Sequence, residues 1–531
     1  MPAKRTLKQS VSTPTAADSP FFDFLEKGRV PSLQERKTIR EILADKMSHL
    51  ASLNSKVPKR RTGKKIPRQL RAELDHTRRF IKFHQALIAP WRRLPIELIA
   101  EIFRFTLEVT NQDDNADDYW NDDRPSTLRL CRICRTWRAI AVSTPALWNV
   151  LSISLHSVSH PIEWISTWLD RSRSFPLYLQ LFWGNKSLPE VINPVLSIFE
   201  THLYHTAGLW IDGLDVEDPD LVTNAYPKGT FPPTQSLHAP LLTTVGSDLP
   251  PDSKWDWIST ACRASPRLTR LTVSKFSIDW FPITNLTKMH IIDPVSMSDV
   301  LQILEHAPSL QDISFDVGGP ATTCSSGKVL VMAAVSRLEI TSTDHLGDFL
   351  EQIELPALKE IGIHQIANWP DAAFRSFISR SSCILKILEF YDVEISENQI
   401  IGCLQDKVCN MLEGLVVSEC DPPALGLLQH LTYRQHPFPN PHLTSIVLAN
   451  LQAPDGFLAA LVESRMSPPV TELPANAPTP ARLARMRFSF IEGPGSVTHI
   501  NDWSQLQDLY KAYPELELIW PEDLTVYSTL V

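Results

Sequence analysis

The stretch LQDISF, residues 310–315, carries apolar side chains at its first, fourth and sixth positions. The same pattern recurs along the chain from residue 242, at intervals of 26, 18, 24, 25, 23, 27, 27, 31 and 40 residues. Its last two apolar positions are two residues apart, as on one face of a β-strand. One such unit cannot bury this face alone, so we expect neighbouring units to stack. The pattern begins at Leu242, Leu268, Leu286, Leu310, Val335, Leu358, Leu385, Leu412, Leu443 and Leu483.

This array resembles a leucine-rich-repeat solenoid. The resemblance implies an α/β fold over residues 150–531, with an inner layer of strands and helical spacers outside, such as residues 296–309 and 347–357. Earlier strands are expected at LSISL (151–155) and PLYLQL (176–181). The Asn or Cys that usually closes each repeat is mostly absent, and Cys420 is the nearest match. We therefore expect an irregular array with longer loops near residues 213–240 and 465–480.

A second pattern begins at LPIELIAEIF, residues 94–103. Proline in the first turn of a helix costs no intrahelical hydrogen bond, so we expect a helix from Pro95. Its apolar residues exceed what one stripe requires, which predicts that two of its sides are covered. A further helix is expected after an acidic interruption, with its apolar face ending shortly before Leu147-Trp148. The apolar residues are Ile96, Leu98, Ile99, Ile102, Phe103 and Leu107 in the first helix, and Leu130, Ile133, Cys134, Trp137, Ile140 and Ala141 in the second.

These residues resemble the F-box, in the version common in large families of fungal F-box proteins. The resemblance implies docking to the Skp adaptor of a Skp-cullin-F-box ubiquitin ligase. The adaptor contacts it implies are Leu94, Pro95, Leu98, Ile102, Cys134 and Trp137. The alternative for Ile133, Cys134 and Trp137 is that they form the internal core of these helices. The acidic insert at residues 111–124 departs from the usual compact pattern, and it either loops out or hinders docking.

The N-terminal part is expected to hold a tail and a helical hairpin. The first residues are rich in Ser, Thr, Ala and Pro and predict a disordered tail over residues 1–30. Prolines and a glycine in KVPKRRTGKKIP (56–67) favour a turn between two amphipathic helices, which gives a coiled-coil-like hairpin over residues 31–89. The basic cluster in this turn is compatible with a solvated hinge, a nuclear-import signal or a nucleic-acid contact. The two apolar seams are Ile39, Leu43, Met47, Leu50 and Leu53, and Leu70, Leu74, Thr77, Ile81 and Leu87; the basic cluster is Lys59, Arg60, Arg61, Lys64 and Lys65.

Charge and cysteine content limit the classes of partner and compartment. Residues 1–90 carry 20 Lys and Arg against 8 Asp and Glu, whereas the remainder carries 31 against 52. A basic N-terminal part and an acidic remainder indicate separate interaction surfaces, and the acidic remainder disfavours a nucleic-acid partner. Eight dispersed cysteines indicate reduced thiols. Without an apolar signal segment or a window of about 20 apolar residues, we expect a cytoplasmic or nuclear protein with no membrane partner.

Catalytic and metal-binding motifs are lacking in the sequence. It contains no Gly-x-Ser-x-Gly elbow, His-Glu-x-x-His helix or Gly-x-x-x-x-Gly-Lys loop. Cys131 and Cys134 have no second cysteine pair in sequence reach to complete a zinc site, and we interpret Cys403 and Cys409 as ordinary thiols as well. The acidic run DDNADDYWNDD (113–123) lacks the Gly and the final Glu of an EF-hand loop. We therefore expect no enzyme activity, no cofactor and no metal.

The sequence thus predicts a tail (1–30), a helical hairpin (31–89), F-box-like helices (90–149) and a leucine-rich-repeat-like solenoid (150–531). The first functional hypothesis is a ligase substrate receptor that docks the Skp adaptor and cullin core through residues 90–149 and an unknown protein substrate through the solenoid. The second is a ligase-independent scaffold or interaction module. A third, a nucleic-acid binder acting through the basic hairpin, is weaker because no stacking aromatic residues accompany its charges.

Overall fold

The computed structural model divides the chain into two units, Met1–Asn149 with Thr167–Phe175 and Val150–Ser166 with Pro176–Val531. Helices account for the first unit, and a long parallel sheet with helices accounts for the second. None of the helices that can be described combines the length and apolar content needed to cross a membrane. The described residues are 19–26, 29–57, 67–108, 127–155, 161–183, 189–213, 238–247, 256–318, 329–342, 345–420, 425–434, 438–468, 480–490 and 499–519.

The first unit contains two apolar clusters. One joins α1, α2 and α3 around Ile39, Leu43 and Ile81, and α2 packs on α3 as the two apolar seams predict. The other joins α4, α5, α6 and η5 around Phe103 and Trp148. The elements of this unit are α1 (Phe22–Glu26), α2 (Leu33–Ser55), α3 (Arg68–Leu87), η3 (Pro90–Arg93), α4 (Ile96–Glu108), α5 (Thr127–Ile133), α6 (Arg135–Ser143) and η5 (Pro145–Leu147).

Three features of this unit differ from expectation. The helix predicted around residues 130–141 is two helices, because Cys134 is extended (φ −158°, ψ 169°) and its Sγ accepts a hydrogen bond from the Trp137 N–H at the start of α6. As a result Ile133 is 58% exposed rather than part of the buried face. The predicted tail contains α1, which is ordered because Phe21 and Phe24 bury their rings in the hairpin cluster. Met47, assigned to the buried seam, is exposed.

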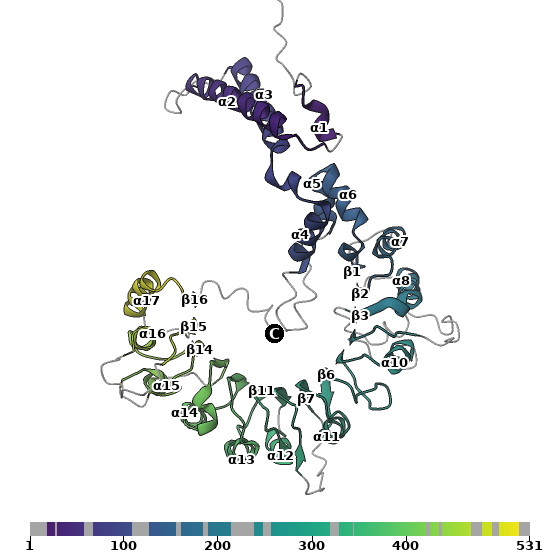
Figure 1. The fold of residues 1–531 in the computed structure, drawn as a ribbon. Coiled ribbons are helices and arrows are strands. Elements are labelled where there is room, and N and C mark those ends of the chain that lie inside the picture. The colour runs from purple at the N-terminus through teal and green to yellow at the C-terminus, as the bar shows by residue number, and fades with distance from the viewer. Residues whose placement is uncertain are drawn as a thin grey trace, which may run out of the picture. The chain divides into compact units, whose positions relative to one another are not determined.

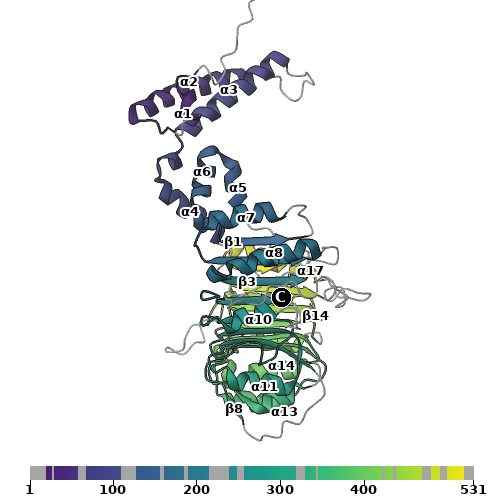
Figure 2. The ribbon, with the colours of Figure 1, turned by 90° about the vertical axis from the view of Figure 1, so that its right-hand side faces the viewer.

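In the second unit, 14 parallel strands pair in chain order, and Figure 1 shows helices along the outer side of this row of strands. Figure 2 shows the same strands stacked edge to edge. The solenoid-like α/β architecture is therefore confirmed. The strands of the large sheet are β1 (Val150–Ser154), β2 (Leu177–Trp183), β3 (Thr206–Gly213), β4 (Thr244–Ser247), β5 (Arg270–Val273), β6 (Lys288–Val295), β7 (Asp312–Val317), β9 (Arg337–Ser342), β11 (Glu360–Ile366), β12 (Ile387–Val393), β13 (Gly414–Ser418), β14 (Ser445–Leu451), β15 (Arg485–Phe490) and β16 (Glu517–Ile519).

Helices connect most of these strands, and a small two-stranded parallel sheet pairs β10 (Ile353–Glu354) with β8 (Leu330–Val331). The predicted spacers are helical: α11 lies within residues 296–309 and α12 within or beside residues 347–357. The remaining elements are α7 (Pro161–Ser172), α8 (Pro189–His202), η6 (Leu203–His205), α10 (Asp256–Arg263), α11 (Met297–His306), α12 (Leu346–Gln352), α13 (Asp371–Ser381), α14 (Glu397–Leu404), η7 (Lys407–Met411), α15 (Leu425–Leu431), α16 (Phe457–Met466) and α17 (Ile500–Ala512).

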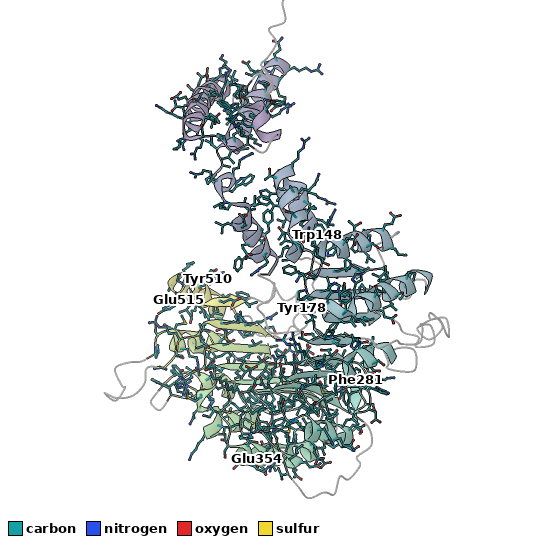
Figure 3. The ribbon with its side chains drawn as sticks, turned by 45° about the vertical axis from the view of Figure 1, so that its right-hand side comes forward. Trp148, Tyr178, Phe281, Glu354, Tyr510 and Glu515 are labelled. Atoms are coloured by element: carbon teal, nitrogen blue, oxygen red, sulfur yellow. The ribbon has the colours of Figure 1, made fainter. Side chains whose placement is uncertain are left out.

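The repeat pattern sets the register of the sheet. All ten pattern-starting residues, from Leu242 to Leu483, are buried, and a strand begins two residues after each. The second apolar position then stacks from strand to strand, as Leu338 pairs with Ile361, Ile361 with Leu388 and Leu388 with Leu415. Side chains fill the space between strands and helices, as Figure 3 shows. Successive side chains of a strand point to opposite faces of the sheet. The buried positions face the helices, and the residues between them line the opposite face, which we call the inner face.

Four strands were not predicted: β3 and β16 of the large sheet, and β8 and β10 of the small one, β10 lying within the spacer expected at residues 347–357. β16 was missed because Glu515 occupies the position where the pattern would begin, while Leu516 and Leu518 supply the apolar contacts. The basic turn, the acidic insert and most of the two predicted long loops lie outside the described residues.

Candidate protein-interaction surfaces

Helix α4 has two apolar stripes. Ile99 and Phe103 are one helical turn apart and are buried in the cluster with Trp148. Leu98, Ile102 and Phe105 follow each other at spacings of four and three residues and are 51%, 47% and 58% exposed. Residues spaced in this way lie on one side of a helix, so α4 presents a continuous apolar face to solvent. We call Leu94, Leu98, Ile102 and Phe105, all exposed, the α4 face.

Four of the six residues predicted to contact an adaptor lie in or beside this face. Leu98 and Ile102 are on it, and Leu94 and Pro95 precede α4, with the Leu94 N–H bonded to the Trp91 carbonyl oxygen at 3.1 Å. Large exposed apolar groups on one surface are typical of protein interaction sites. The prediction did not include Phe105. The helical spacing from Leu98 through Ile102 would have identified Phe105.

The other two predicted residues are half-buried. The Trp137 ring lies 4.7 Å from that of Phe103 and packs edge-on against Trp91 at 5.8 Å, measured between ring centroids. Cys134 caps α6, as described above. Trp137 thus contributes to the internal packing of these helices, which is the alternative the sequence left open for it.

A cluster of charged side chains lies on the inner face of the second unit, on β9, β11 and β12. Arg337 approaches Glu339 (Nη2–Oε2, 3.8 Å) and Glu360 (Nε–Oε2, 3.9 Å), and His364 Nε2 lies 3.4 Å from Glu339 Oε1. Glu389 also lines a hollow of ≈ 10 Å³ at this place, about the space of one water molecule. We call Arg337, Glu339, Glu360, His364 and Glu389 the inner-face cluster.

The inner-face cluster holds more negative than positive charge. Burial raises the pKa of Glu389, and the carboxylates of Glu339 and Glu360 raise it further against the opposing effect of Arg337. Burial lowers the pKa of His364, although Glu339 favours its protonation, so the imidazole brings little positive charge at neutral pH. For Arg337, burial alone would lower the pKa, but the surrounding carboxylates prevail and raise it. Three carboxylates therefore share one guanidinium, which favours a cationic partner group.

No local motif in the sequence announces this cluster, because its members come from strands 23 and 27 residues apart. Gly362, at its centre, matters for the packing. A Cβ atom at that position would lie 3.0 Å from His364 Nε2 and 3.5 Å from Glu339 Cγ. The missing side chain leaves room for the hollow.

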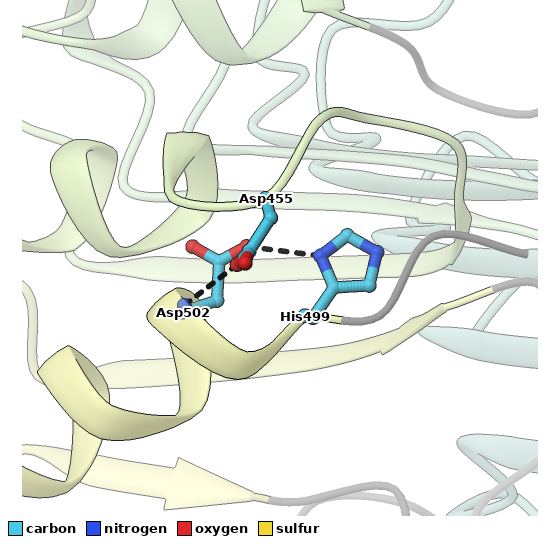
Figure 4. A group of neighbouring side chains, drawn as sticks. All are labelled: Asp455, His499 and Asp502. Carbon is cyan, nitrogen blue, oxygen red and sulfur yellow. Dashed lines mark hydrogen bonds and ion pairs between the residues drawn. The ribbon is translucent and has the colours of Figure 1, made fainter.

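One group of side chains in the described parts of the chain could hold a metal ion, Asp455, His499 and Asp502, shown in Figure 4. Its carboxylates already accept hydrogen bonds from backbone N–H groups. Asp455 accepts hydrogen bonds from the Asn501 and Asp502 N–H groups at 3.0 and 2.9 Å, at the start of α17. Asp502 accepts one from the Ala459 N–H at 2.8 Å, at the start of α16, and lies 3.0 Å from His499 Nδ1. The arrangement is explained as two helices that cap each other's N-termini.

Comparison with known proteins gives no close relative. No protein-family model matches the sequence, and no characterised protein does. Among solved structures, the chain is similar to a crystal structure of a Bacteroides fragilis protein, with 14% identity, a TM-score of 0.32, and coverage of 58% of this chain and 85% of that one. It is also similar to the crystal structure of the yeast Rad7 and Elc1 complex, with 12% identity, a TM-score of 0.29, and coverage of 87% and 100%. Similarity at this level establishes neither a common fold nor a common function.

Proposed function

We propose that this protein is a non-enzymatic receptor that joins two other proteins: a Skp-type adaptor at the α4 face and a protein substrate at the inner face of the solenoid. The observation that carries the proposal is the α4 face, an exposed apolar stripe on a segment whose sequence resembles the F-box. In this role the chemistry of ubiquitin transfer belongs to other subunits. The receptor raises the effective concentration of a substrate lysine near the ubiquitin that is to be transferred.

The inner-face cluster supports the substrate half of the proposal. An excess of carboxylates around Arg337 fits a substrate segment with a Lys or Arg side chain, because such a cation would relieve the repulsion among Glu339, Glu360 and Glu389. The concave inner layer of a solenoid also offers side chains from many strands to one partner.

The adaptor half is tested by co-expression with a Skp-type adaptor, followed by size-exclusion chromatography with mass determination. We expect a stoichiometric complex. Replacing Leu94 and Pro95 by Ala should weaken it by roughly 2 to 4 kcal/mol, as truncation of central interface anchors often does. The Leu98→Glu/Ile102→Glu variant alters exposed positions and should abolish the complex. Ile384→Ala, an exposed apolar residue of the solenoid, serves as the control.

A folded chain that does not bind the adaptor would rule out the receptor and leave the ligase-independent scaffold. The substrate half is tested separately, by quantitative mass spectrometry of proteins that co-purify with the chain. Glu339→Lys/Glu389→Lys should lose a specific subset that Glu515→Lys, an exposed change on another part of the unit, retains. An identical set of proteins with both variants would remove the inner-face cluster from the proposal.

A further inference from the structure

Three Ser-Pro dipeptides occur in the sequence, at Ser19, Ser265 and Ser467. They differ in their surroundings. Ser467 is exposed at the end of α16. Ser265 is buried in the solenoid, where its Oγ donates to the Ala239 carbonyl oxygen at 3.1 Å. Ser19 is also buried, but it lies at the beginning of the described chain, just before α1. Ser-Pro is the dipeptide that proline-directed protein kinases modify, so the surroundings of Ser19 bear on regulation.

The Ser19 hydroxyl is fully engaged. Its Oγ lies 2.9 Å from His84 Nε2 on α3 and accepts a hydrogen bond from the Phe21 N–H at 3.2 Å. His84 Nδ1 lies 2.9 Å from the Phe80 carbonyl oxygen, which can only accept. The proton of the neutral ring is therefore on Nδ1, and Nε2 accepts the Ser19 proton. The bond to His84 holds the start of α1 against the hairpin, and the bond from Phe21 fixes the turn that leads into α1.

Helix α1 has five residues and is too short to be stable alone. It is held by the rings of Phe21 and Phe24, which are buried in the cluster with Ile39, Leu43, Ile81 and Leu87. The Arg29 guanidinium lies 4.4 Å from the centre of the Phe24 ring and pairs with Glu35 of α2 at 2.8 Å. Helix α1 is thus attached to the α2–α3 hairpin on both sides, by Ser19 before it and by Arg29 after it.

We propose that Ser19 is a phosphorylation site and that phosphate on its Oγ releases α1 from the hairpin. A proline-directed kinase transfers the γ-phosphoryl group of ATP: the P–Oγ bond forms, the bond from the γ-phosphorus to the bridging oxygen of ADP breaks, and the hydroxyl proton goes to the kinase base. The product cannot donate the hydrogen bond to His84, and it carries close to two negative charges at neutral pH.

The closed site cannot accommodate that charge. Burial lowers the pKa of His84, whose ring stacks on Phe80 at 4.1 Å, so the nearest polar partner of Ser19 is neutral. The Lys46 ammonium is directed at the Phe80 ring, 5.9 Å from its centre. A phosphate dianion without a paired cation in such surroundings is strongly disfavoured relative to water. Because Ser19 is buried in the closed form, the kinase acts on the open form and traps it.

Phosphorylation would therefore control whether an apolar surface of the hairpin is covered or exposed. When α1 leaves, the side chains of Ile39, Leu43, Ile81 and Leu87 lose the cover of Phe21 and Phe24 on a hairpin that is rich in Lys and Arg. The hairpin then exposes these apolar side chains to solvent. This inference does not depend on the proposed receptor function.

The test uses the full-length chain, a purified proline-directed kinase and ATP, with phosphate quantified at each site by peptide mass spectrometry. Phe21→Ala/Phe24→Ala opens α1 and should increase the rate at Ser19 at least tenfold, while the rate at exposed Ser467, the internal control, stays the same. Hydrogen exchange of residues 21–26 and 39–43 should then be faster in the phosphorylated chain than in the unmodified one. Ser19→Ala should prevent the phosphate-dependent change.

Two outcomes would overturn the proposal. If Ser19 stays unmodified in Phe21→Ala/Phe24→Ala, the dipeptide is not a kinase site. If a chain with complete phosphorylation at Ser19 keeps or increases the protection of residues 21–26, the phosphate does not release α1.

Discussion

A fully buried guanidinium, that of Arg465, joins α16 to the segment that runs from the end of α15 toward β14. Its Nε donates to the Leu431 carbonyl oxygen at 2.8 Å, and Nη1 donates to the Tyr433 hydroxyl at 3.0 Å. Nη1 and Nη2 also approach the Asn440 and Pro439 carbonyl oxygens at 3.4 and 3.3 Å. The guanidinium carbon lies over the Tyr433 ring, 4.3 Å from its centre. Burial lowers the pKa of Arg465 to about 10, so the group stays charged at neutral pH.

Replacing Arg465 by Ala should be strongly destabilising, because it removes a large buried side chain and leaves several carbonyl oxygens without donors. We expect a loss of about 3 to 5 kcal/mol in the free energy of unfolding, measured with urea. Arg482→Ala, at an exposed arginine of the same part of the chain, should change it by less than about 0.5 kcal/mol. Equal effects of the two substitutions would contradict this reading of the buried hydrogen bonds.

Asp455 should make the free energy of unfolding depend on pH in the acidic range. Burial is the largest single effect and raises its pKa, but the Asn501 and Asp502 N–H groups and nearby His499 together lower it more, so the folded pKa lies below the ordinary 3.8. A carboxyl group with a depressed folded pKa stabilises the protein above its unfolded pKa, and this contribution disappears as pH falls through the folded value. Asp455→Asn should therefore lower the free energy of unfolding at pH 7, and by progressively less below pH 3.8. Chemical unfolding at several pH values measures this, and a constant difference would argue against it.

At the scale of the element, the strands of the central repeats end in the same way. The sixth residue from the start of β11, β12, β13 and β14 takes a left-handed conformation with φ between 53° and 57°, and none of these residues is glycine. The chain skips one position in the ladder there, since His364 pairs with Tyr391 and Ile366 with Val393. The left-handed residue turns the strand toward its outer connection. The four residues are Gln365, Asp392, Glu419 and Asn450.

The cost of this turn is measurable at Asp392, which is exposed and has φ 54°. Asp392→Gly should be neutral or stabilising by up to about 1 kcal/mol, because glycine adopts positive φ freely. Asp392→Val should be destabilising by about 1 to 2 kcal/mol, because a β-branched side chain is strained there. Thermal or urea unfolding of the two variants is sufficient. The element-scale explanation fails if valine is tolerated as well as glycine.

At the scale of the second unit, each strand of the large sheet pairs only with its neighbours in chain order. Stability in such an array is close to a sum of repeat and interface contributions, so damage should remain local. Leu415 on β13, fully buried between Leu388 and Ile446, tests this. Leu415→Ala should cost about 2 to 5 kcal/mol. Hydrogen exchange should accelerate in β12–β14 and leave β2–β5 unchanged; uniform acceleration would show that the unit unfolds as one.

The inner layer of the fold could be predicted from the sequence. The leucine pattern is local, and each match specifies a buried bend residue and two buried positions of one strand, so it marks the place of ten strands in the chain. The apolar pattern after Pro95 also predicted the α4 helix, and the resemblance to the F-box pointed to Leu94, Leu98 and Ile102 of its exposed face. It failed where the local signal is weak, as at Glu515 in the last repeat, and where one side chain redirects the backbone, as Cys134 does between α5 and α6.

Other features were decided only by tertiary structure, because they join residues that are distant in the chain. Ser19 meets His84 across 65 positions, and this contact with the burial of Phe21 and Phe24 orders a segment whose composition predicts disorder. The inner-face cluster exists because parallel pairing brings equivalent positions of successive repeats side by side. Local sequence determines which residues turn inward in each repeat. The stacking of repeats determines which charges become neighbours, and no single segment contains that information.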